Sequence, residues 1–184
     1  MKHKYWWLFL ASFGLLLSIQ ALWMPAKAGL GQLLLQRHWQ QVLAGKPASS
    51  PWPGADMQAV ARLEVPGMGI EQLILAGQQG AQLAWAPGLV SAAGAGISDT
   101  VISAHRDSHF SFLKNLAQGE LIKLQTSEGS YQYKVSYTQI VDSNISQLQL
   151  DPAGRRLILT TCYPFDTLQT GGPLRYVVTA SLAN

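Results

Sequence analysis

The stretch RRLILTTCYPF, residues 155–165, contains a well-marked predicted strand and the only cysteine of the chain, Cys162. Isoleucine and threonine favour a strand here, and Pro164 ends it because proline cannot donate to a sheet ladder. Side chains alternate along a strand, so Ile158, Thr160 and Cys162 share one face. Free cysteine is among the most buried residue types, which favours a core position for Cys162. Its place at the end of the strand favours an accessible nucleophile instead. The strand alone leaves both interpretations open.

Segments of the same kind follow one another from residue 55 onward. Strands are predicted at 61–65, 70–77, 99–105, 120–126, 130–141, 156–162 and 174–182, with short helices at 81–88 and 110–116. The strand at 130–141 has a clear period of two, which predicts one face running from Tyr131 through Tyr133 and Val135 to Tyr137. Seven or eight short strands without βαβ alternation predict a mainly β fold, a closed or nearly closed β-barrel with short helices.

Charge is unevenly distributed along the 184 residues. Residues 1–47 carry five cations and no acidic residue, whereas residues 48–184 carry eight cations and ten acidic residues. The globular part therefore offers no basic stripe, which argues against a nucleic-acid partner. A single cysteine excludes an internal disulfide and a multi-cysteine metal site.

The N-terminal segment predicts a membrane anchor. Residues 5–24, YWWLFLASFGLLLSIQALWM, run without a charge, and at about 1.5 Å per residue they match a hydrocarbon core of roughly 30 Å. Aromatic residues at both ends, such as Tyr5 and Trp23, suit the interfacial belts. A cleaved signal peptide is the competing interpretation, because AKA at 26–28 resembles a cleavage site, but the apolar stretch is longer than a usual signal core. We expect a retained transmembrane anchor.

Positive charges flank this predicted span on both sides. Lys2 and Lys4 precede it, and Lys27 follows it closely. The charges alone do not settle the orientation, but a short tail before one span, followed by a globular domain, favours a cytoplasmic N-terminus. We therefore expect residues 1–4 to be a cytoplasmic tail and the globular domain to lie on the outer side of the membrane.

The segment 25–54 connects the predicted span to the globular domain. Apolar residues recur at helical spacing up to Val42, which predicts a juxtamembrane helix. The sequence KPASSPWPG at 46–54 predicts a linker, because its prolines and small residues resist both helix and strand. We expect His38 to be a surface or interfacial residue rather than a ligand, and the globular domain to comprise residues 55–184.

Two polar residues besides Cys162 stand in places that need an explanation. His105 ends a predicted strand, where a structural role is common. It could form a zinc site with His109 only if the backbone between them were helical and a third ligand were present. Arg175 lies inside the apolar stretch PLRYVVTASL. Burying a guanidinium costs several kcal/mol unless an acceptor meets it, because it cannot be neutralised at ordinary pH. Pairing with Asp166 is the plain explanation, and a site that presents a cation to developing negative charge is the other.

Together, Cys162, His105 and Arg175 suit acyl transfer. The thiolate is the nucleophilic form of cysteine, and a neighbouring imidazolium favours it and can protonate a leaving amine. An arginine can hold the substrate carbonyl and stabilise a tetrahedral oxyanion. This chemistry requires no cofactor and no metal.

These residues, in this order, resemble those of a sortase. LTTC at 159–162 fits the family's Leu-x-Thr-Cys signature, LRYVV fits its arginine-bearing strand, and His105 fits its histidine. The strings AHRDSHFSFL, TCYPFD, GGPLRYVVTA and PWPGADMQAVARLEVP resemble the proteobacterial sortases of class GN, as does the juxtamembrane helix. Ala104 stands where that subgroup usually has glycine, a small-for-small change. Asp107 and His109 match the subgroup, but the resemblance assigns them no role.

The resemblance implies an eight-stranded sortase β-barrel and a single-pass cysteine transpeptidase of the inner (cytoplasmic) membrane, with its catalytic domain facing the periplasm or exterior. Cys162 would attack a C-terminal sorting signal of the Leu-Pro-x-Thr-Gly type, His105 would act as acid and base, and Arg175 would stabilise the oxyanion. The thioacyl-enzyme would pass to an amine acceptor or to water. The implied partner is a secreted protein bearing the sorting signal, in this subgroup one with a von Willebrand-type domain.

Two alternatives come from other classes. An L,D-transpeptidase is also a β-rich cysteine enzyme, but its signature has glycine before the cysteine and arginine two residues after it, where Thr161 and Pro164 stand here. A non-catalytic, membrane-anchored β-domain scaffold would have Cys162 in the core and Arg175 paired with Asp166.

Overall fold

The computed structural model describes residues 4–46, 50–90, 95–168 and 171–183. The chain divides into two compact units, Met1–Leu34 and Leu35–Asn184. The described part of the first unit belongs to one helix, and the second unit contains all of the described strands.

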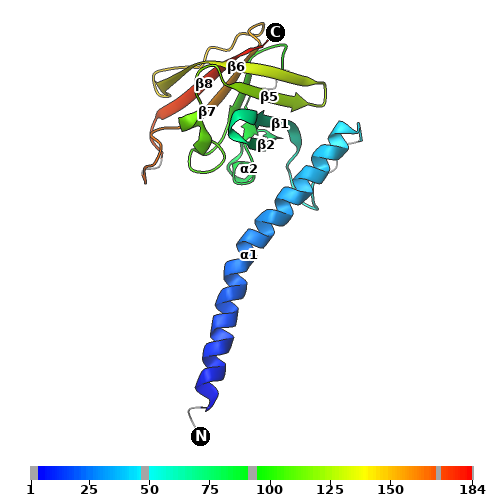
Figure 1. Cartoon of the computed structure of the whole chain (residues 1–184), viewed down its shortest axis with the longest axis vertical. Coiled ribbons are helices and arrows are strands. Elements are labelled where there is room, and N and C mark those ends of the chain that lie inside the picture. The colour runs from blue at the N-terminus through cyan, green and yellow to red at the C-terminus, as the bar shows by residue number, and fades with distance from the viewer. Residues whose placement is uncertain (1–3, 47–49, 91–94, 169–170, 184) are drawn as a thin grey trace. The chain divides into compact units, whose positions relative to one another are not determined.

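Helix α1 (Lys4–Leu43) contains the predicted membrane-spanning segment (Figure 1). It is the one helix of the described chain that is long and apolar enough to cross a membrane, and its apolar window is fully exposed. This agrees with a single span at 5–24. The same properties fit a signal sequence, so retention of the anchor stays a prediction. Pro25 lies inside α1, so the predicted juxtamembrane helix is continuous with the apolar segment.

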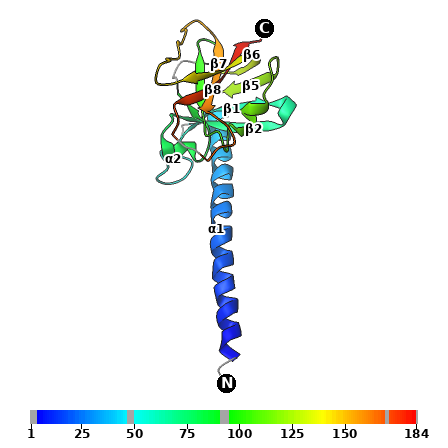
Figure 2. The same ribbon diagram turned by 90° about the vertical axis from the view of Figure 1, so that its left-hand side faces the viewer.

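Eight strands close into a barrel in the order β1-β2-β3-β4-β7-β8-β6-β5 (Figures 1 and 2). The strands are β1 (Ala59–Val65), β2 (Ile70–Ala76), β3 (Gly88–Leu89), β4 (Thr100–Ser103), β5 (Leu121–Thr126), β6 (Ser130–Asp142), β7 (Arg156–Cys162) and β8 (Leu174–Leu182). The short helices are η1 (Pro66–Met68), α2 (Gly80–Leu83) and η2 (Ser111–Asn115). The predicted eight-stranded, mainly β barrel is confirmed.

Strand alternation divides the side chains of the barrel into an inner core and a small outer cluster. Along β7, Leu157 and Leu159 belong to the large inner core, whereas Ile158 packs with Val101 and Val177 in the outer cluster. Because the period of a strand is two, Cys162 faces the same side as Ile158, as predicted.

The prediction that one face of β6 runs from Tyr131 to Tyr137 is wrong. The pairing of β6 with β8 shifts register between Val135 and Tyr137. Tyr133 and Val135 are buried in the inner core, whereas Tyr137 lines an outer cavity. A β-bulge adds one residue to one strand and so inverts the alternation beyond it, which a simple period of two cannot reveal.

The strand β3 is absent from the sequence expectations, which place a helical turn at 81–88. Two residues cannot produce an alternating pattern, so β3 is recognised only by its pairing, parallel to β2 and antiparallel to β4. Its first residue, Gly88, cannot be replaced without movement, because a Cβ there would collide with the carbonyl oxygen of Gly77.

The C-terminal end of α1 packs within the second unit. Leu35 and Trp39 are fully buried in a cluster that includes Ala59, Leu73, Leu75 and Ala86. Trp52, from the predicted linker, contacts Trp85 with ring centroids 5.3 Å apart. His38 is buried rather than at the surface. Residues 35–46 and 50–54 therefore share a compact unit with the barrel.

A buried carboxylate organises the segment between β6 and β7. The Asp99 side chain is 1% exposed and pairs with the Arg156 guanidinium. It also accepts hydrogen bonds from the backbone N–H of Asp151, at 2.7 Å, and of Arg156, at 3.0 Å. A Cβ at Gly154 would lie only 2.5 Å from Asp99 Oδ1, so this turn requires glycine. Asp99 thus ties the C-terminal part of this segment to the start of β4.

These interactions determine how Asp99 titrates. Burial alone would raise the pKa of the Asp99 carboxyl, but the hydrogen bond from the Arg156 guanidinium, the backbone hydrogen bonds and the charge of Arg156 lower it overall. A carboxyl whose pKa is lower in the folded state than in the unfolded state favours folding while it is ionised.

Asp99→Asn should lower the free energy of unfolding by about 2–4 kcal/mol at neutral pH, because it leaves the Arg156 cation without its carboxylate. In the wild type this stabilisation is complete above the ordinary carboxyl pKa of 3.8 and is lost as the pH falls through the lower folded value. Denaturant titrations from pH 7 to pH 2 should therefore show the two proteins converging in acid. Asp56→Asn, at an exposed position, is the control, and a wild-type advantage that persists unchanged in acid would contradict this account.

Trp39→Ala should destabilise the second unit by about 3–5 kcal/mol, because it removes a large, fully buried side chain from a packed cluster. Gln40→Ala changes the exposed neighbouring position on the same helix and should have little effect. Thermal unfolding of the full chain in detergent micelles measures both. Equal melting temperatures for the two variants would show that the end of α1 does not support the barrel.

Candidate active site

Strand pairing brings three distant segments to one edge of the barrel. β4 and β7 run parallel, with Ser103 opposite Thr160, so the chain leaves both strands at the same edge. The N–H of Ala104 donates to the Thr160 carbonyl at 3.3 Å and extends this pairing toward His105. β8 runs antiparallel to β7, and Cys162 lies opposite Arg175. The β8 strand therefore begins at the edge where β4 and β7 end.

A cavity of about 640 Å³ runs along the outer face of β7 and β8 and reaches this edge. His105, Cys162 and Arg175 all line it, so the structure brings together the three residues that the sequence singles out. Thr160 and Ile158 line it as well, as expected from their shared face with Cys162. The remaining wall comes from the outer faces of β6 and β8 and from residues 146–149 before β7.

The cavity lining has a distinct chemical character. Its apolar part includes Val101, Ile158 and Val177. Polar but uncharged residues such as Gln139 and Thr179 make up much of the remainder. Among the described lining residues there is no carboxylate, and the guanidinium groups are those of Arg156 and Arg175. The imidazole of His105 also lines the cavity. Such a lining suits a short, mostly uncharged peptide segment.

Cys162 is half-buried and His105 is exposed, so both side chains are accessible from solvent. The thiol therefore does not occupy the inner core, which is filled by its strand neighbours Leu157 and Leu159. This location favours the interpretation of Cys162 as a displayed nucleophile over that of a core residue.

Arg175 does not pair with Asp166, although such a pair would have been the plain explanation of its position. Its Nη1 donates to the carbonyl oxygens of Gly172, at 2.7 Å, and Leu174, at 2.9 Å. Asp166 instead pairs with Lys114, at 2.9 Å. No ion pair involves Arg175 in the described part of the chain. Its positive charge is thus not neutralised by a described carboxylate, and it faces the cavity beside the thiol.

His109 lies close enough to His105 for the two imidazoles to interact electrostatically. Burial lowers the pKa of His109; a hydrogen bond with the backbone of Ala84 opposes this effect, and the charge of His105 adds to it. The pKa of His109 is lowered overall, which favours its neutral form. Residues 104–110 are not helical, so the helical geometry that a His105–His109 zinc site would need is not present.

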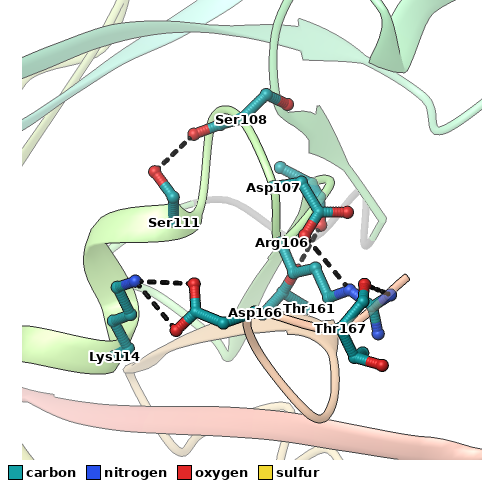
Figure 3. Close-up of polar contacts among 9 residues, drawn as sticks. Arg106, Asp107, Ser108, Ser111, Lys114, Thr161, Asp166 and Thr167 are labelled. Atoms are coloured by element: carbon teal, nitrogen blue, oxygen red, sulfur yellow. Dashed lines mark hydrogen bonds and ion pairs between the residues drawn. The ribbon is translucent and has the colours of Figure 1, made fainter. Parts of the chain in front are cut away.

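Arg106 is the main residue of this region that sequence reasoning missed. It is 7% exposed, although it lies in the polar string HRDSHF. Its Nη2 donates to the carbonyl oxygen of Thr167 at 3.2 Å, and its Nε contacts Asp107 Oδ1 at 3.3 Å (Figure 3). Nothing in the neighbouring sequence distinguishes this arginine from an exposed one, because its burial depends on the loop after Cys162.

Thr161 was not singled out either, although it belongs to the Leu-x-Thr-Cys signature. Its hydroxyl donates to the carbonyl oxygen of Ala104 at 2.7 Å, and both residues are buried. This hydrogen bond joins the residue before Cys162 to the residue before His105. It holds the ends of β7 and β4 together beyond their last paired residues.

Comparisons with known proteins agree with this architecture. The family model described as "Sortase domain" matches residues 63–183. Sortase D of Bacillus subtilis (strain 168) is 38% identical over 79 residues, which are 42% of this chain and 39% of that protein. The chain therefore matches about two fifths of the length of this curated relative.

Solved structures of other sortases share the fold. Sortase A from Corynebacterium diphtheriae, a lid mutant, has a TM-score of 0.61 and 20% identity, with 87% of this chain and 95% of that chain covered. A sortase D5 transpeptidase from Clostridium perfringens has a TM-score of 0.66 and 16% identity, covering 85% and 99%. Sortase C from Clostridium perfringens with the C-terminal cell wall sorting motif has a TM-score of 0.60 and 17% identity, covering 86% and 90%.

At these identities the structural similarity is evidence for the fold, and the family model supplies the evidence for kinship. The model spans about two thirds of the chain, from β1 through the last strand, and it includes the cavity edge with its cysteine, histidine and arginine. This chain belongs to the sortase family.

Proposed function

We propose that the protein is a membrane-anchored cysteine transpeptidase that cleaves a C-terminal sorting signal and transfers the product to an amine. One observation carries this proposal: Cys162, His105 and Arg175 line a single cavity at the ends of three neighbouring strands. A thiol, an imidazole and a guanidinium beside one cavity are the groups that acyl transfer through a thioester requires.

In the proposed acylation step, the Cys162 thiolate attacks the carbonyl carbon that precedes the scissile peptide bond. The carbonyl oxygen becomes an oxyanion, and the Arg175 guanidinium stabilises it by donating hydrogen bonds. His105 protonates the leaving amine as the tetrahedral intermediate collapses. The products of this half-reaction are a thioacyl-enzyme and the released C-terminal fragment.

The second half-reaction reverses these roles. An acceptor amine attacks the thioester carbonyl, and His105 takes the proton that the amine loses. The tetrahedral intermediate again places negative charge beside Arg175, and its collapse releases the Cys162 thiolate with a new amide bond. Water replaces the amine when no acceptor arrives, and the outcome is then hydrolysis.

The cavity supports a sorting signal of the Leu-Pro-x-Thr-Gly type as the substrate. Its volume of about 640 Å³ and its apolar patch around Val101, Ile158 and Val177 suit a few residues with aliphatic or small side chains. The resemblance of AHRDSHFSFL and GGPLRYVVTA to class GN sortases extends the proposal to that subgroup. Its partner would be a secreted protein bearing the sorting signal, such as one with a von Willebrand-type domain.

The proposed location follows from α1 and its flanking charges. The apolar segment would act as a single-pass anchor in the inner (cytoplasmic) membrane, with the barrel facing the periplasm or exterior. A catalytic domain tethered in this way would meet substrates that have already been exported.

The scaffold alternative has no specific observation in its favour. It requires Cys162 as packing in the core and an Arg175–Asp166 pair, whereas Cys162 lines a cavity and Asp166 pairs with Lys114. No cofactor takes part in the proposed chemistry.

The wild-type full chain in detergent micelles, incubated with a Leu-Pro-x-Thr-Gly peptide, should form a peptide–enzyme thioester, because the thiol faces the substrate cavity. Intact-protein mass spectrometry should detect the adduct in the wild type, and Cys162→Ala should form none. Thr160→Ser, which keeps a hydroxyl on the same cavity wall, is the control and should retain the adduct. Failure of a panel of such sorting-signal peptides to form an adduct, with Cys162 resistant to alkylation in the folded protein, would rule out the catalytic role.

Arg175→Lys should lower kcat/KM by about 10²–10³, because one ammonium does not reproduce the forked donor geometry at the developing oxyanion. Arg155→Lys is a matched control, since Arg155 is an exposed arginine next to β7 and should tolerate the change. Peptide-cleavage kinetics measure both variants, with thermal unfolding to confirm the fold. Near-normal turnover in Arg175→Lys would remove Arg175 from the mechanism.

A further inference from the structure

We propose that Arg106 is a positioning residue of this site, whose buried guanidinium holds the segment carrying His105 against the segment that follows Cys162. This inference rests on the proposed transpeptidase function and extends it to a residue that lies outside the cavity lining. Arg106 directly follows His105 in the chain, but it acts through the backbone of the β7–β8 loop rather than on the substrate.

The contacts of Arg106 point away from the cavity and toward this loop. The Nη2 atom donates to the carbonyl oxygen of Thr167, five residues after Cys162, at 3.2 Å (Figure 3). Because the acceptor is a backbone carbonyl, the bond fixes the path of the loop and not merely one side chain. The Nε atom contacts the carboxylate of Asp107, at 3.3 Å, which lies at the protein surface.

A second hydrogen bond involves Ala104, the residue on the other side of His105. The Thr161 hydroxyl donates to the Ala104 carbonyl at 2.7 Å. The residues on both sides of His105 are therefore bonded to the segment 161–167, which contains Cys162. The regular β4–β7 pairing ends at Ser103, so these two ties help to set the separation of imidazole and thiol beyond the sheet.

Burial of Arg106 favours retention of its hydrogen bond to the Thr167 carbonyl. A guanidinium remains charged at ordinary pH, and Arg106 is only 7% exposed, so releasing its acceptors inside the protein would leave a buried charge poorly compensated. The loop therefore stays bonded to Arg106 in the folded molecule. A misplacement of about 1 Å between reacting groups can cost roughly 10²-fold in rate, so a tie next to the imidazole matters for catalysis.

A nearby exposed ion pair can be compared with the buried interaction of Arg106. Lys114 pairs with Asp166, the residue before Thr167, at 2.9 Å, but the two side chains are 39% and 76% exposed. Figure 3 shows both interactions reaching the same loop from the segment between β4 and β5. Exposed ion pairs contribute little because water screens them. If the buried guanidinium is what positions the site, removing the Lys114 pair should have a much smaller effect.

The test uses the full chain in detergent micelles and the variant Arg106→Met, which keeps an apolar stem but removes every donor. We expect kcat for peptide cleavage to fall by about tenfold or more while KM changes by less than about threefold, because substrate contacts are retained and the alignment of imidazole and thiol is not. Lys114→Gln should stay within about twofold of the wild type in both parameters. Wild-type kcat in folded Arg106→Met would overturn the proposal.

A double-mutant cycle supplies a measurement that needs no peptide. The alkylation rate of Cys162 by iodoacetamide at pH 7 is compared with and without His105→Ala, first in the wild type and then in Arg106→Met. His105→Ala should slow alkylation markedly in the wild type and much less in Arg106→Met, because the imidazole is no longer aligned with the thiol. An equal effect in both backgrounds, or no effect in the wild type, would overturn the positioning role.

The two arms separate this inference from the proposed function. Suppose that no sorting-signal peptide is cleaved, but that His105→Ala slows alkylation much more in the wild type than in Arg106→Met. This result would remove the transpeptidase function and keep the positioning role. Suppose instead that the wild type cleaves a sorting-signal peptide and that His105→Ala slows alkylation equally in the wild type and in Arg106→Met. This result would keep the transpeptidase function and remove the positioning role.

A second variant covers the case in which Arg106→Met does not fold. Arg106→Lys keeps a buried positive charge but cannot direct one donor to Thr167 and another to Asp107 in the fork geometry. It should show the same reduced His105–Cys162 coupling and a kcat at least about threefold below the wild type. Full coupling together with wild-type kcat in Arg106→Lys would equally overturn the proposal.

Discussion

The parallel pairing of β4 with β7 is the constraint on which the site depends. Strands that run in the same direction end at the same edge of a sheet, so the residues after Ser103 and Thr160 emerge side by side. The antiparallel strand β8 begins at that edge and brings Arg175 opposite Cys162. A slip of one residue in either pairing would turn Cys162 or Arg175 toward the inner core and remove the cavity edge.

The side chains of Arg106, Arg156 and Arg175 are satisfied in three different ways. Arg156 pairs with the buried carboxylate of Asp99, Arg106 donates to the Thr167 backbone and contacts Asp107, and Arg175 donates to two backbone carbonyls. A guanidinium cannot lose its charge at ordinary pH, so each arrangement reflects where that charge is compensated. Of these three, only Arg175 lacks a carboxylate partner in the described chain, and it is also the one opposite the thiol. In the proposed mechanism, this charge stabilises the oxyanion.

Local patterns were enough to predict the barrel but not all of its details. Long alternating segments such as 156–162 predicted their strands correctly, because burial of one face leaves a period of two in the sequence. The same rule failed at the bulge between Val135 and Tyr137, where one extra residue inverts the facing side chains. It also missed β3 at Gly88–Leu89, because two residues form no pattern and the strand exists only through its neighbours.

The sequence by itself determined the apolar N-terminal segment, the β-rich class, and three polar residues in apolar or strand-end positions. These properties depend on a residue and its near neighbours. Only the tertiary structure decided that His105, Cys162 and Arg175 share a cavity, that Asp166 pairs with Lys114, and that Arg106 in a polar loop is buried. Each of these depends on which distant segments pair and in what register, because burial and the choice of an acceptor are properties of the packed fold rather than of the local sequence.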